Sequence, residues 1–509
     1  MNHVQPLHGA DPAQELGLLI KSRYPIVFLE TWEEERAERL VRTIARRLNK
    51  PLFVWTATKG LFRSDLPNAI YNTAQPLQAL AHISSMSLVA LYLLKDFQAH
   101  LEDPIILRKL KDISEQFESR EGCLIICSSV VSIPTDLKRI AVHFVLQLPS
   151  REELRRTITE TVDEMRYKGN VHIGLTADEM DQLADRLKGL TGSEARRAIC
   201  QAILDDNRLT QEDLPRILER KKEIIEKSSI LEVYYCEDPS TSIGGMKQLK
   251  AWLAKRKKVF SREAEKQGLQ PPKGILILGV QGCGKSQMAK TVAMDWGLPL
   301  LRLDPGKIYD KYIGESEKNL RQALTIAESM APVVLWIDEI EKGFSYSQGS
   351  DADAGLSKRV FGAFLTWLQE KEGSVFVVAT ANDIPSLPPE FLRKGRFDEI
   401  FFVDLPGLEE RKEIFAIHLR KRKKDPQEFD LGLLAERAKG FSGAEIEQVI
   451  ISGLYSAFSG SGNLNTKLIL EEIESTKPLS VTMREKIDDL RDWARERTVP
   501  AGESFNEDE

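Results

Sequence analysis

The pattern of apolar and polar residues predicts an α/β fold in the first half of the chain. Apolar runs typical of buried strands alternate with amphipathic stretches such as Glu33 to Leu48, which predicts a helix. Strands separated by helices indicate a parallel sheet. The predicted strands of this half are Tyr24 to Leu29, Pro51 to Trp55, Leu88 to Leu94, Cys123 to Cys127 and His143 to Leu146.

The second half repeats the alternation, with predicted strands at Gly274 to Leu278, Val333 to Ile337 and Ser374 to Ala379. Before it, residues 200–235 are charged and helical in pattern, and Asp238 to Thr241 marks a linker. After it, Thr482 to Arg497 predicts one more helix.

Three pairs of segments indicate that the first half is a copy of the second. Their order is the same in both halves, so a duplicated domain explains them better than chance. The pairs are Asn49 to Trp55 with Gly297 to Leu303, Leu148 to Glu153 with Leu405 to Glu410, and Leu183 to Ile199 with Leu434 to Ile450.

A glycine-rich stretch directly after the strand Gly274 to Leu278 carries the strongest chemical signal. It reads Gly279-Val280-Gln281-Gly282-Cys283-Gly284-Lys285-Ser286, a complete phosphate-binding loop. The glycines let backbone N–H groups turn toward phosphate oxygens, Lys285 brings positive charge to the β and γ phosphates, and the Ser286 hydroxyl can ligate Mg²⁺. The loop, with Gln287 after it, predicts a site for a nucleoside triphosphate and Mg²⁺.

Two later strands deliver polar side chains to the same edge of the predicted sheet. Val333 to Ile337 leads to Asp338 and Glu339, at the end of the strand where ligands bind in open α/β sheets. We expect Asp338 to hold Mg²⁺ through water and Glu339 to orient or deprotonate the attacking water. The next strand leads to Asn382, whose amide can report on the γ phosphate, although an Asn after a strand is by itself more often a turn former.

The first half lacks this chemistry. After its first strand the chain reads Glu30-Thr31-Trp32-Glu33-Glu34-Glu35, whose carboxylates repel phosphate and whose bulky residues cannot form the loop. Lys95-Asp96 stands where the second half has its acidic pair. We therefore expect a degenerate, non-catalytic domain with a structural or partner-binding role.

Composition narrows the class of protein. The 509 residues are too many for one ordinary core, and a net charge of -6 gives no general attraction to nucleic acid. Two basic runs, Lys255 to Lys258 and Arg420 to Lys424, are interpreted as solvated faces. No apolar segment approaches the ~18 residues of a membrane span, and no signal-peptide pattern is present. Five cysteines without a CxxC pair offer no metal-ligand spacing and fit a cytoplasmic compartment.

Further residues resemble the AAA family of ATPases, over about residues 238–455. Leu392-Arg393-Lys394-Gly395-Arg396-Phe397-Asp398-Glu399 resembles that family's second region of homology. The resemblance implies ATP as the nucleotide, a homo-hexamer, and Arg393 and Arg396 as arginine fingers that reach the neighbouring subunit's nucleotide. Without the pattern, both arginines would be interpreted as surface ion-pair residues.

The same resemblance implies which residues surround the adenine. Ile243 and Gly244 lie in Ser242-Ile243-Gly244-Gly245, which resembles the segment that wraps the base. His418 matches the family's adenine-side histidine, although a single helix histidine is more often structural. Gly443-Ala444-Glu445 resembles the lid motif of the family's classical branch, which implies that Gly443 and Ala444 lie near the nucleotide.

A protein client is implied by a further likeness. Lys311-Tyr312-Ile313-Gly314-Glu315-Ser316-Glu317 resembles the pore loop, which grips polypeptide in the centre of the ring through an aromatic, an aliphatic and a glycine residue. An exposed Tyr312 beside Ile313 can stack on an extended chain, and Gly314 lets the loop move. The alternative interpretation is a tyrosine packed on its own domain.

Cys283 departs from the family's usual loop. A thiol at a helix N-terminus near Lys285 could have a lowered pKa, which suggests oxidative inhibition. The alternative is a small residue that simply fits.

The layout of nearly the whole chain resembles the AAA ATPases encoded in cyanobacterial genomes and some algal plastid genomes. That likeness suggests the plastid stroma for a plastid-encoded chain and a tie to the regulation of photosynthetic carbon acquisition. The first hypothesis is a ring ATPase that remodels or threads a protein client. The second is a nucleotide-gated adaptor or scaffold whose inactive first half binds a partner. Nucleic-acid remodelling rests only on the basic runs, and neither a nucleic acid nor a membrane is an expected partner.

The predicted fold class is α/β, a parallel-sheet P-loop AAA module with a C-terminal helical lid, preceded by a degenerate AAA-like α/β domain. The predicted boundaries are 1–205 for the degenerate domain, 206–237 for a helical connector, 238–405 for the ATPase core, 406–480 for the lid, 481–499 for a C-terminal helix and 500–509 for a disordered acidic tail.

Overall fold

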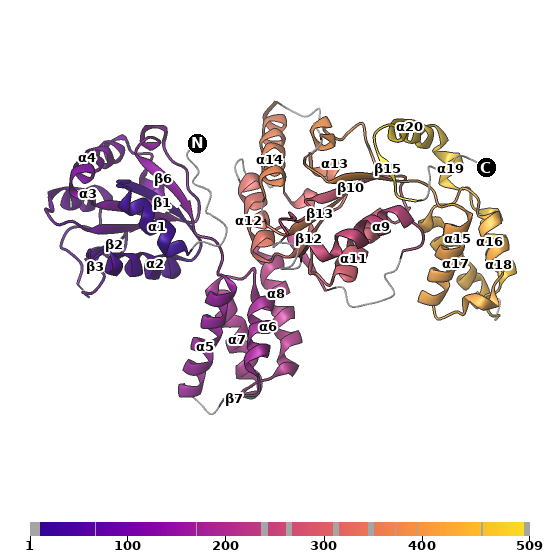
Figure 1. The fold of residues 1–509 in the computed structure, drawn as a ribbon, viewed down its shortest axis with the longest axis horizontal. Coiled ribbons are helices and arrows are strands. Elements are labelled where there is room, and N and C mark those ends of the chain that lie inside the picture. The colour runs from indigo at the N-terminus through magenta and orange to yellow at the C-terminus, as the bar shows by residue number, and fades with distance from the viewer. Residues whose placement is uncertain are drawn as a thin grey trace. The chain divides into compact units, whose positions relative to one another are not determined.

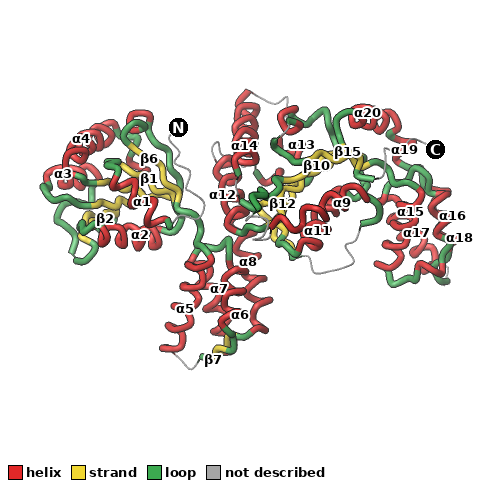
Figure 2. Tube along the Cα trace, viewed as in Figure 1, coloured by secondary structure: helices red, strands yellow, loops and turns green. Residues whose placement is uncertain are grey.

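The chain forms two compact α/β units, Met1–Leu218 and Glu219–Glu509 (Figure 1). Both contain strands flanked by helices (Figure 2). The computed structural model describes residues 11–66, 68–168, 171–235, 243–260, 267–308, 315–344, 351–371, 373–393, 395–459 and 462–502.

The first unit is built on a six-stranded sheet in the order β3-β2-β4-β5-β1-β6. All neighbouring strands are parallel except β2 and β3, which are antiparallel. The strands are β1 (Ile26–Glu30), β2 (Leu52–Thr56), β3 (Gly60–Arg63), β4 (Leu91–Lys95), β5 (Cys123–Ser128) and β6 (Ala141–Val145).

Helices cover both faces of this sheet, which explains why its strands are continuous apolar runs. Phe28 on β1 packs toward α3 and α4, whereas its neighbour Val27 packs toward α1 and α2. Successive side chains of a strand point to opposite faces, so the apolar run supplies two cores at once. The helices are α1 (Pro12–Lys21), α2 (Glu34–Arg47), α3 (Pro76–Ser85) and α4 (Pro104–Arg120).

A helical segment follows the sheet. Thr176 and Thr191 each begin a helix with a capping box, in which the threonine hydroxyl and a glutamate three residues later exchange hydrogen bonds with the backbone. The elements are α5 (Arg151–Lys168), β7 (His172–Ile173), α6 (Ala177–Leu187), α7 (Gly192–Asp206), β8 (Arg208–Leu209) and α8 (Leu214–Ser228).

The second unit has a seven-stranded sheet in the order β15-β14-β10-β13-β12-β11-β9. Strands β10 to β14 pair parallel with one another, and the edge strand β9 pairs antiparallel with β11. The strands are β9 (Leu231–Tyr234), β10 (Gly274–Gly279), β11 (Leu300–Leu303), β12 (Val333–Ile337), β13 (Val375–Ala381), β14 (Glu399–Val403) and β15 (Val499–Pro500).

Helices follow strands β10, β11 and β12 of this sheet, and the helices after β14 form a lid. Four helices, α15 to α18, form the lid around their own core, which includes Phe415, Leu434, Ile446 and Ile469. The helices are α9 (Lys247–Arg256), α11 (Lys285–Trp296), α12 (Glu315–Ser329), α13 (Ile340–Phe344), α14 (Asp351–Glu370), α15 (Leu408–Lys421), α16 (Leu431–Arg437), α17 (Gly443–Ser459), α18 (Thr466–Ser475), α19 (Leu479–Thr482) and α20 (Arg484–Arg495).

The two units share one strand order. Reading across the sheets, β2-β4-β5-β1-β6 of the first unit corresponds to β11-β12-β13-β10-β14 of the second. Asp96 and Glu339, which follow the corresponding strands β4 and β12, also share a left-handed backbone, with φ of 53° and 51°. The duplicated domain stays a prediction, and it would account for this agreement.

Two segments differ from the sequence prediction. Leu231 to Tyr235, expected to end a helical connector, contains β9, because Leu231 and Val233 alternate with Glu232 and bury one face at the sheet edge. Residues 500 and 501, expected to lie in a disordered tail, are bonded to the sheet: Val499 and Pro500 pair with β14, and the Ala501 N–H donates to the Phe402 carbonyl at 2.9 Å. Residues 503–509 lie outside the described part of the chain.

Candidate nucleotide site

The phosphate-binding loop of the second unit lies between β10 and α11, as the sequence predicted. Gly279 approaches β14 so closely that a Cβ there would lie 2.0 Å from the Val403 carbonyl oxygen. Gly284 has a φ of 86°, a conformation that side chains other than glycine rarely adopt. These two glycines let the five residues 280–284 turn tightly into the helix.

Lys285 opens α11 and is only 5% exposed. Its Nζ donates to the carbonyl oxygens of Gly279 and Val280, at 2.9 and 2.7 Å. Burial lowers the pKa of this amine to about 8, against the opposing influence of nearby acidic groups. The Lys285 side chain is therefore held inside the predicted phosphate-binding loop.

The acidic pair lies next to the loop, at the end of β12. The Ser286 hydroxyl donates to Asp338 Oδ1 at 2.7 Å, and the Thr380 hydroxyl of β13 donates to the same oxygen at 2.7 Å. The Glu339 N–H in turn donates to Thr380 Oγ1 at 3.1 Å. One threonine on the neighbouring strand therefore holds both acidic residues.

Asn382 is in direct contact with the predicted base. Its Nδ2 donates to Glu339 Oε1 at 2.9 Å, and Lys342 forms an ion pair with the other oxygen of Glu339. The Asn382 N–H donates to Glu341 Oε1 at 3.0 Å. Hydrogen bonds thus connect the predicted sensor, the predicted base and Glu341, a carboxylate to which the sequence assigned no role.

The residues present fit Mg²⁺ and a phosphate chain. Ser286 and Asp338 bring a hydroxyl and a carboxylate together, and oxygen ligands of this kind are those that Mg²⁺ prefers. The buried Lys285 ammonium lies beside the same loop. Among the described residues, no cluster of three His, Cys, Asp or Glu side chains offers a separate metal site.

The residues expected around the adenine come from three segments that meet. A Cβ on Gly244 would lie 3.0 Å from Ile414 of α15, and one on Gly443 would lie 3.9 Å from the same side chain. The Ala444 N–H donates to the Gly282 carbonyl at 3.0 Å, which joins the lid to the phosphate-binding loop. Ile243 precedes Gly244 and is half-buried.

His418 lies one turn beyond Ile414 on α15. Its Nδ1 is 3.4 Å from Glu447 Oε1 without forming a hydrogen bond, and Arg422 donates to that oxygen at 2.8 Å. Burial lowers the pKa of His418, so the ring is neutral near pH 7.

Lid carboxylates hold the turn that follows Gly244. The Gly245 N–H donates to Glu413 Oε2 at 2.8 Å, and the Met246 N–H donates to Glu410 Oε1 at 3.1 Å. A pocket beside this turn is also lined by Cys283, Asp404, Gly443 and Ala501. The chain's last described residues therefore form part of its wall.

Three protein-family models match the chain. Residues 12–146 match the SpoVK-like AAA ATPase, N-terminal domain, and residues 152–228 match the second domain of the same proteins. Residues 275–405 match the ATPase family associated with various cellular activities (AAA).

Similar proteins cover nearly the full length. The AAA domain-containing protein ycf46 of Pyropia yezoensis is 40% identical over 487 residues, which are 94% of this chain and 97% of that protein. The ycf46 protein of Guillardia theta is 39% identical, over 94% of each chain. The chain belongs to the ycf46 branch of the AAA ATPases. A shorter likeness, 35% over 216 residues, is to the proteasome-activating nucleotidase of Aeropyrum pernix, covering 41% of this chain and 52% of that protein.

The two arginines of this AAA ATPase lie near η7 (Pro389–Leu392). Arg393 is exposed, and the half-buried Arg396 donates to the Glu390 carbonyl. Within the described ranges, neither forms an ion pair with a carboxylate. The surface ion pairs that the alternative interpretation required are therefore not seen there. Tyr312, Ile313 and Gly314 lie outside the described residues.

Cys283 corrects one expectation. Burial raises the pKa of its thiol to about 12, whereas the helix N-terminus and Lys285 were expected to lower it. Desolvation of a thiolate outweighs the attraction of one lysine, so a reactive thiolate is not supported.

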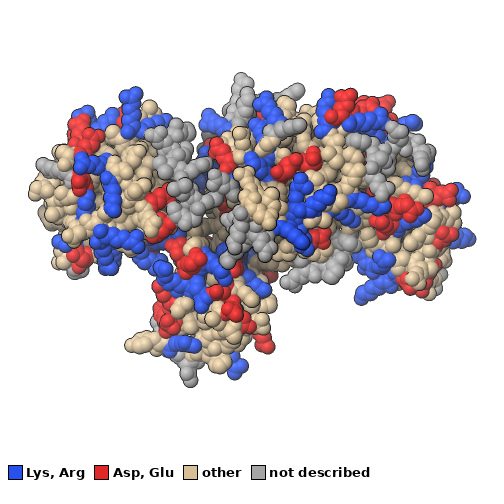
Figure 3. Space-filling view, in the orientation of Figure 1, with Lys and Arg blue, Asp and Glu red and all other residues tan. Residues whose placement is uncertain are grey.

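Three side chains of the two basic runs contact residues of their own unit. Arg256 stacks over Trp252 with its guanidinium carbon 3.4 Å from the ring centroid, and Lys421 and Arg422 lie 3.6 and 2.8 Å from Glu447. The face in Figure 3 mixes acidic and basic side chains. In the described part of the chain, no helix is long and apolar enough to span a bilayer.

The first unit has opposite charges at the place that corresponds to the phosphate-binding loop and the acidic pair. Three residues (31–33) separate β1 from α2, against five in the second unit. Glu34 begins α2, where Lys285 begins α11, and Lys95 stands where Asp338 does. Lys95 Nζ lies 3.8 Å from Glu34 and 2.9 Å from Glu38. Relative to Lys285 and Asp338 of the second unit, the first unit therefore has the acid at the start of the helix and the lysine at the end of the strand.

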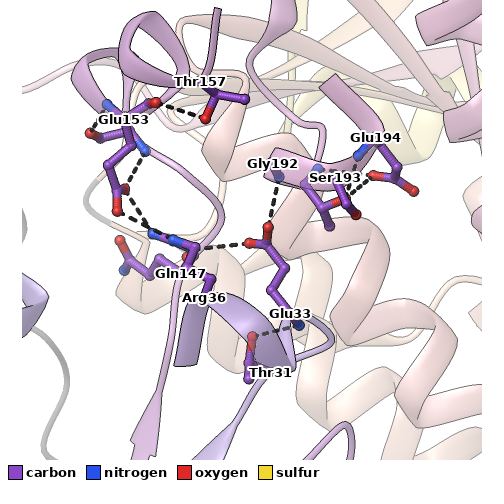
Figure 4. Close-up of polar contacts among 11 residues, drawn as sticks. Thr31, Glu33, Arg36, Gln147, Glu153, Thr157, Gly192, Ser193 and Glu194 are labelled. Atoms are coloured by element: carbon purple, nitrogen blue, oxygen red, sulfur yellow. Dashed lines mark hydrogen bonds and ion pairs between the residues drawn. The ribbon is translucent and has the colours of Figure 1, made fainter. Parts of the chain in front are cut away.

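Glu33 then connects the sheet to the helical segment (Figure 4). Its Oε1 accepts the N–H of Gly192 at 2.6 Å, at the start of α7, and its Oε2 lies 3.1 Å from Arg36. Arg36 also donates to both oxygens of Glu153, at 2.7 and 3.2 Å, and to the Gln147 carbonyl at 2.5 Å. A carboxylate of the chain itself thus occupies the helix N-terminus.

Proposed function

We propose that the second unit hydrolyses ATP with Mg²⁺ at the subunit interfaces of a homo-hexameric ring and uses this to remodel or thread a protein client. One observation carries the hydrolysis: the phosphate-binding loop, the acidic pair and the sensor are joined by direct hydrogen bonds through Ser286, Asp338, Thr380 and Asn382.

Each residue has a distinct task in this proposal. Lys285 and the loop N–H groups bind the phosphates, and Ser286 and Asp338 would hold Mg²⁺, which supplies positive charge to the phosphate oxygens when bound. Glu339, held by Asn382, orients a water molecule and takes its proton. Arg393 and Arg396 supply charge from the adjacent subunit.

The test of hydrolysis is Glu339→Gln in the full chain. We expect ATP binding close to that of the wild type and loss of phosphate release, because the amide cannot accept the proton. Equal hydrolysis by the variant would overturn the assignment. Client capture on this variant with ATP, followed by mass spectrometry, then identifies bound proteins.

Action in trans is tested by mixing two inactive variants. Lys285→Ala removes nucleotide binding but keeps the arginines, and Arg396→Ala removes an arginine but keeps the pocket. Mixed rings should regain hydrolysis, because the intact pocket of one subunit meets the intact arginine of the other. If mixing restores nothing although the proteins co-assemble, the shared-interface proposal fails.

Threading is tested with Tyr312→Ala. Loss of client remodelling with normal ATP hydrolysis supports a pore loop, whereas unchanged remodelling supports the second candidate function below.

The second candidate is a nucleotide-gated adaptor or scaffold whose first unit binds a partner. The observation that favours it is the exchanged pair of Glu34 and Lys95 together with Glu33 on the start of α7. The described residues of this unit hold no charge arrangement suited to a phosphate chain, so we infer that the unit is non-catalytic. Calorimetry should give one ATP per chain, and none for Lys285→Ala. Two sites per chain would refute the inference.

The place of action belongs to the proposal as well. We place a plastid-encoded chain in the plastid stroma and any other chain in the cytoplasm. The regulation of photosynthetic carbon acquisition, which the resemblance in the sequence suggests, is the process to examine.

A further inference from the structure

Glu341 is a buried carboxylate that the proposed roles leave unused. It lies on α13, three residues after Asp338, and is 7% exposed. Its Oε1 accepts the Asn382 N–H at 3.0 Å, and its Oε2 has no hydrogen-bond partner among the described residues. Burying a carboxylate with one oxygen unpartnered costs free energy, which suggests that the hydrogen bond made by its other oxygen has a functional role.

The hydrogen bond to Glu341 holds Asn382, the residue whose side chain donates to the predicted base Glu339. Asn382 comes directly after β13, where the strand ladder ends, so its N–H needs another acceptor. Glu341 supplies it, and the Asn382 amide then reaches Glu339 Oε1 at 2.9 Å. The three residues form a chain of contacts from a buried carboxylate to the predicted base.

We propose that Glu341 is a positioning residue for ATP hydrolysis, which holds the Asn382 main chain so that the Asn382 amide keeps Glu339 in place. This inference rests on the proposed hydrolysis. It concerns the orientation of Glu339 and requires no contact of Glu341 with ATP.

Two substitutions separate the hydrogen bond from the charge. In Glu341→Gln the side-chain oxygen still accepts the Asn382 N–H, so activity should stay within about 3-fold of the wild type. In Glu341→Ala the N–H loses its acceptor and Asn382 can shift. We expect a fall in kcat of about 10-fold to 100-fold, because a displacement of about 1 Å at a catalytic group can cost that much.

The deciding readouts are the split between kcat and KM and a double-mutant comparison in the full chain. Glu341→Ala should lower kcat and leave the KM for ATP within about 2-fold. In an Asn382→Ala background, Glu341→Ala should have almost no further effect, because the path to Glu339 is already cut. Glu370→Ala, at the exposed end of α14, is the control and should behave as the wild type.

Three results would overturn the inference. The first is a Glu341→Ala variant that loses ATP affinity as much as kcat. The second is a double variant in which the effects of Glu341→Ala and Asn382→Ala on kcat multiply. The third is a Glu341→Gln variant as slow as Glu341→Ala. If the wild type binds ATP but does not hydrolyse it, the proposed function itself fails and the positioning role falls with it. If the wild type and Glu341→Ala hydrolyse ATP equally, only the positioning role fails.

Discussion

The hydroxyl of Thr380 donates a hydrogen bond to Asp338, with Oγ1 and Oδ1 2.7 Å apart. The same hydroxyl oxygen accepts the N–H of Glu339. A single side chain on β13 therefore sets the position of the predicted metal-holding carboxylate and of the backbone of the predicted base.

Thr380→Val should slow hydrolysis by roughly 5-fold to 150-fold, the equivalent of about 1–3 kcal/mol for an unmade hydrogen bond at a buried group. Valine keeps the shape of threonine, so the fold should persist. Thr291→Val is the matched control, because its hydroxyl bonds to the Gln287 carbonyl within α11. Steady-state ATPase rates decide, and equal losses in the two variants would contradict the role of Thr380.

Arg491→Met should lower the free energy of unfolding by about 3–5 kcal/mol, because it removes the arginine that pairs with a buried carboxylate. Arg491 Nε lies 2.9 and 3.1 Å from the two oxygens of Asp404, and the two side chains are 12% and 7% exposed. Urea denaturation measures the change. Arg495→Met, which removes an exposed ion pair, is the control and should change stability by less than about 1 kcal/mol.

Glu33→Ala should loosen the start of α7 in the first unit. The Gly192 N–H loses its acceptor and Arg36 loses one of its carboxylates. We expect faster amide hydrogen exchange in peptides that cover residues 190–200, with ATP hydrolysis by the second unit unchanged. Glu35, two residues later on α2, is exposed, so Glu35→Ala is the control and should leave exchange unaltered. Identical exchange in the two variants would show that Glu33 does not hold α7.

Cys283 should react slowly with iodoacetamide. A pKa of about 12 leaves a thiolate fraction on the order of 1 in 10,000 near pH 8, so alkylation should be on the order of 1,000-fold slower than for a free cysteine peptide. Mass spectrometry of timed samples measures the rate. Labelling at the rate of the peptide would restore the hypothesis of a reactive thiol.

The stability of the lid should depend on pH through His418. Its pKa is lowered by burial, with Lys421 and Arg422 acting in the same direction and Glu447 against them. The unfolded chain therefore binds a proton more readily, and stability falls as the pH drops from the usual value of 6.5 toward the lowered one. Between about pH 7.5 and about pH 5.5, the wild type should lose more stability than His418→Gln. Parallel pH profiles would exclude this contribution.

The sequence predicted the central elements because their signals are local. The strand Val333 to Ile337 and the residues Asp338 and Glu339 lie where an apolar run followed by an acidic pair indicated. Thr380 directly follows the predicted strand Ser374 to Ala379, but a threonine at a strand end carries no signal until the register of β12 and β13 places it beside Asp338.

Other contacts are missed for the same reason, because they join distant parts of the chain. Nothing in the sequence near Arg491 indicates that it pairs with Asp404, 87 residues away. The lowered pKa suggested for the Cys283 thiol is wrong in direction. The sequence shows the neighbouring Lys285, which lowers the pKa, but not the burial, which raises it by more. Burial and long-range pairing become visible only once the fold is known.

The exchanged charges of the first unit make its present state hard to reverse by single steps. Replacing Glu34 by lysine would place two cations together beside Lys95, and replacing Lys95 by aspartate would bring that carboxylate close to Glu34 and Glu38. Each single change is thus opposed by like-charge repulsion, and the shortened loop would need extra residues as well. A phosphate site could therefore arise in this unit only if both charges and the length of the loop changed together.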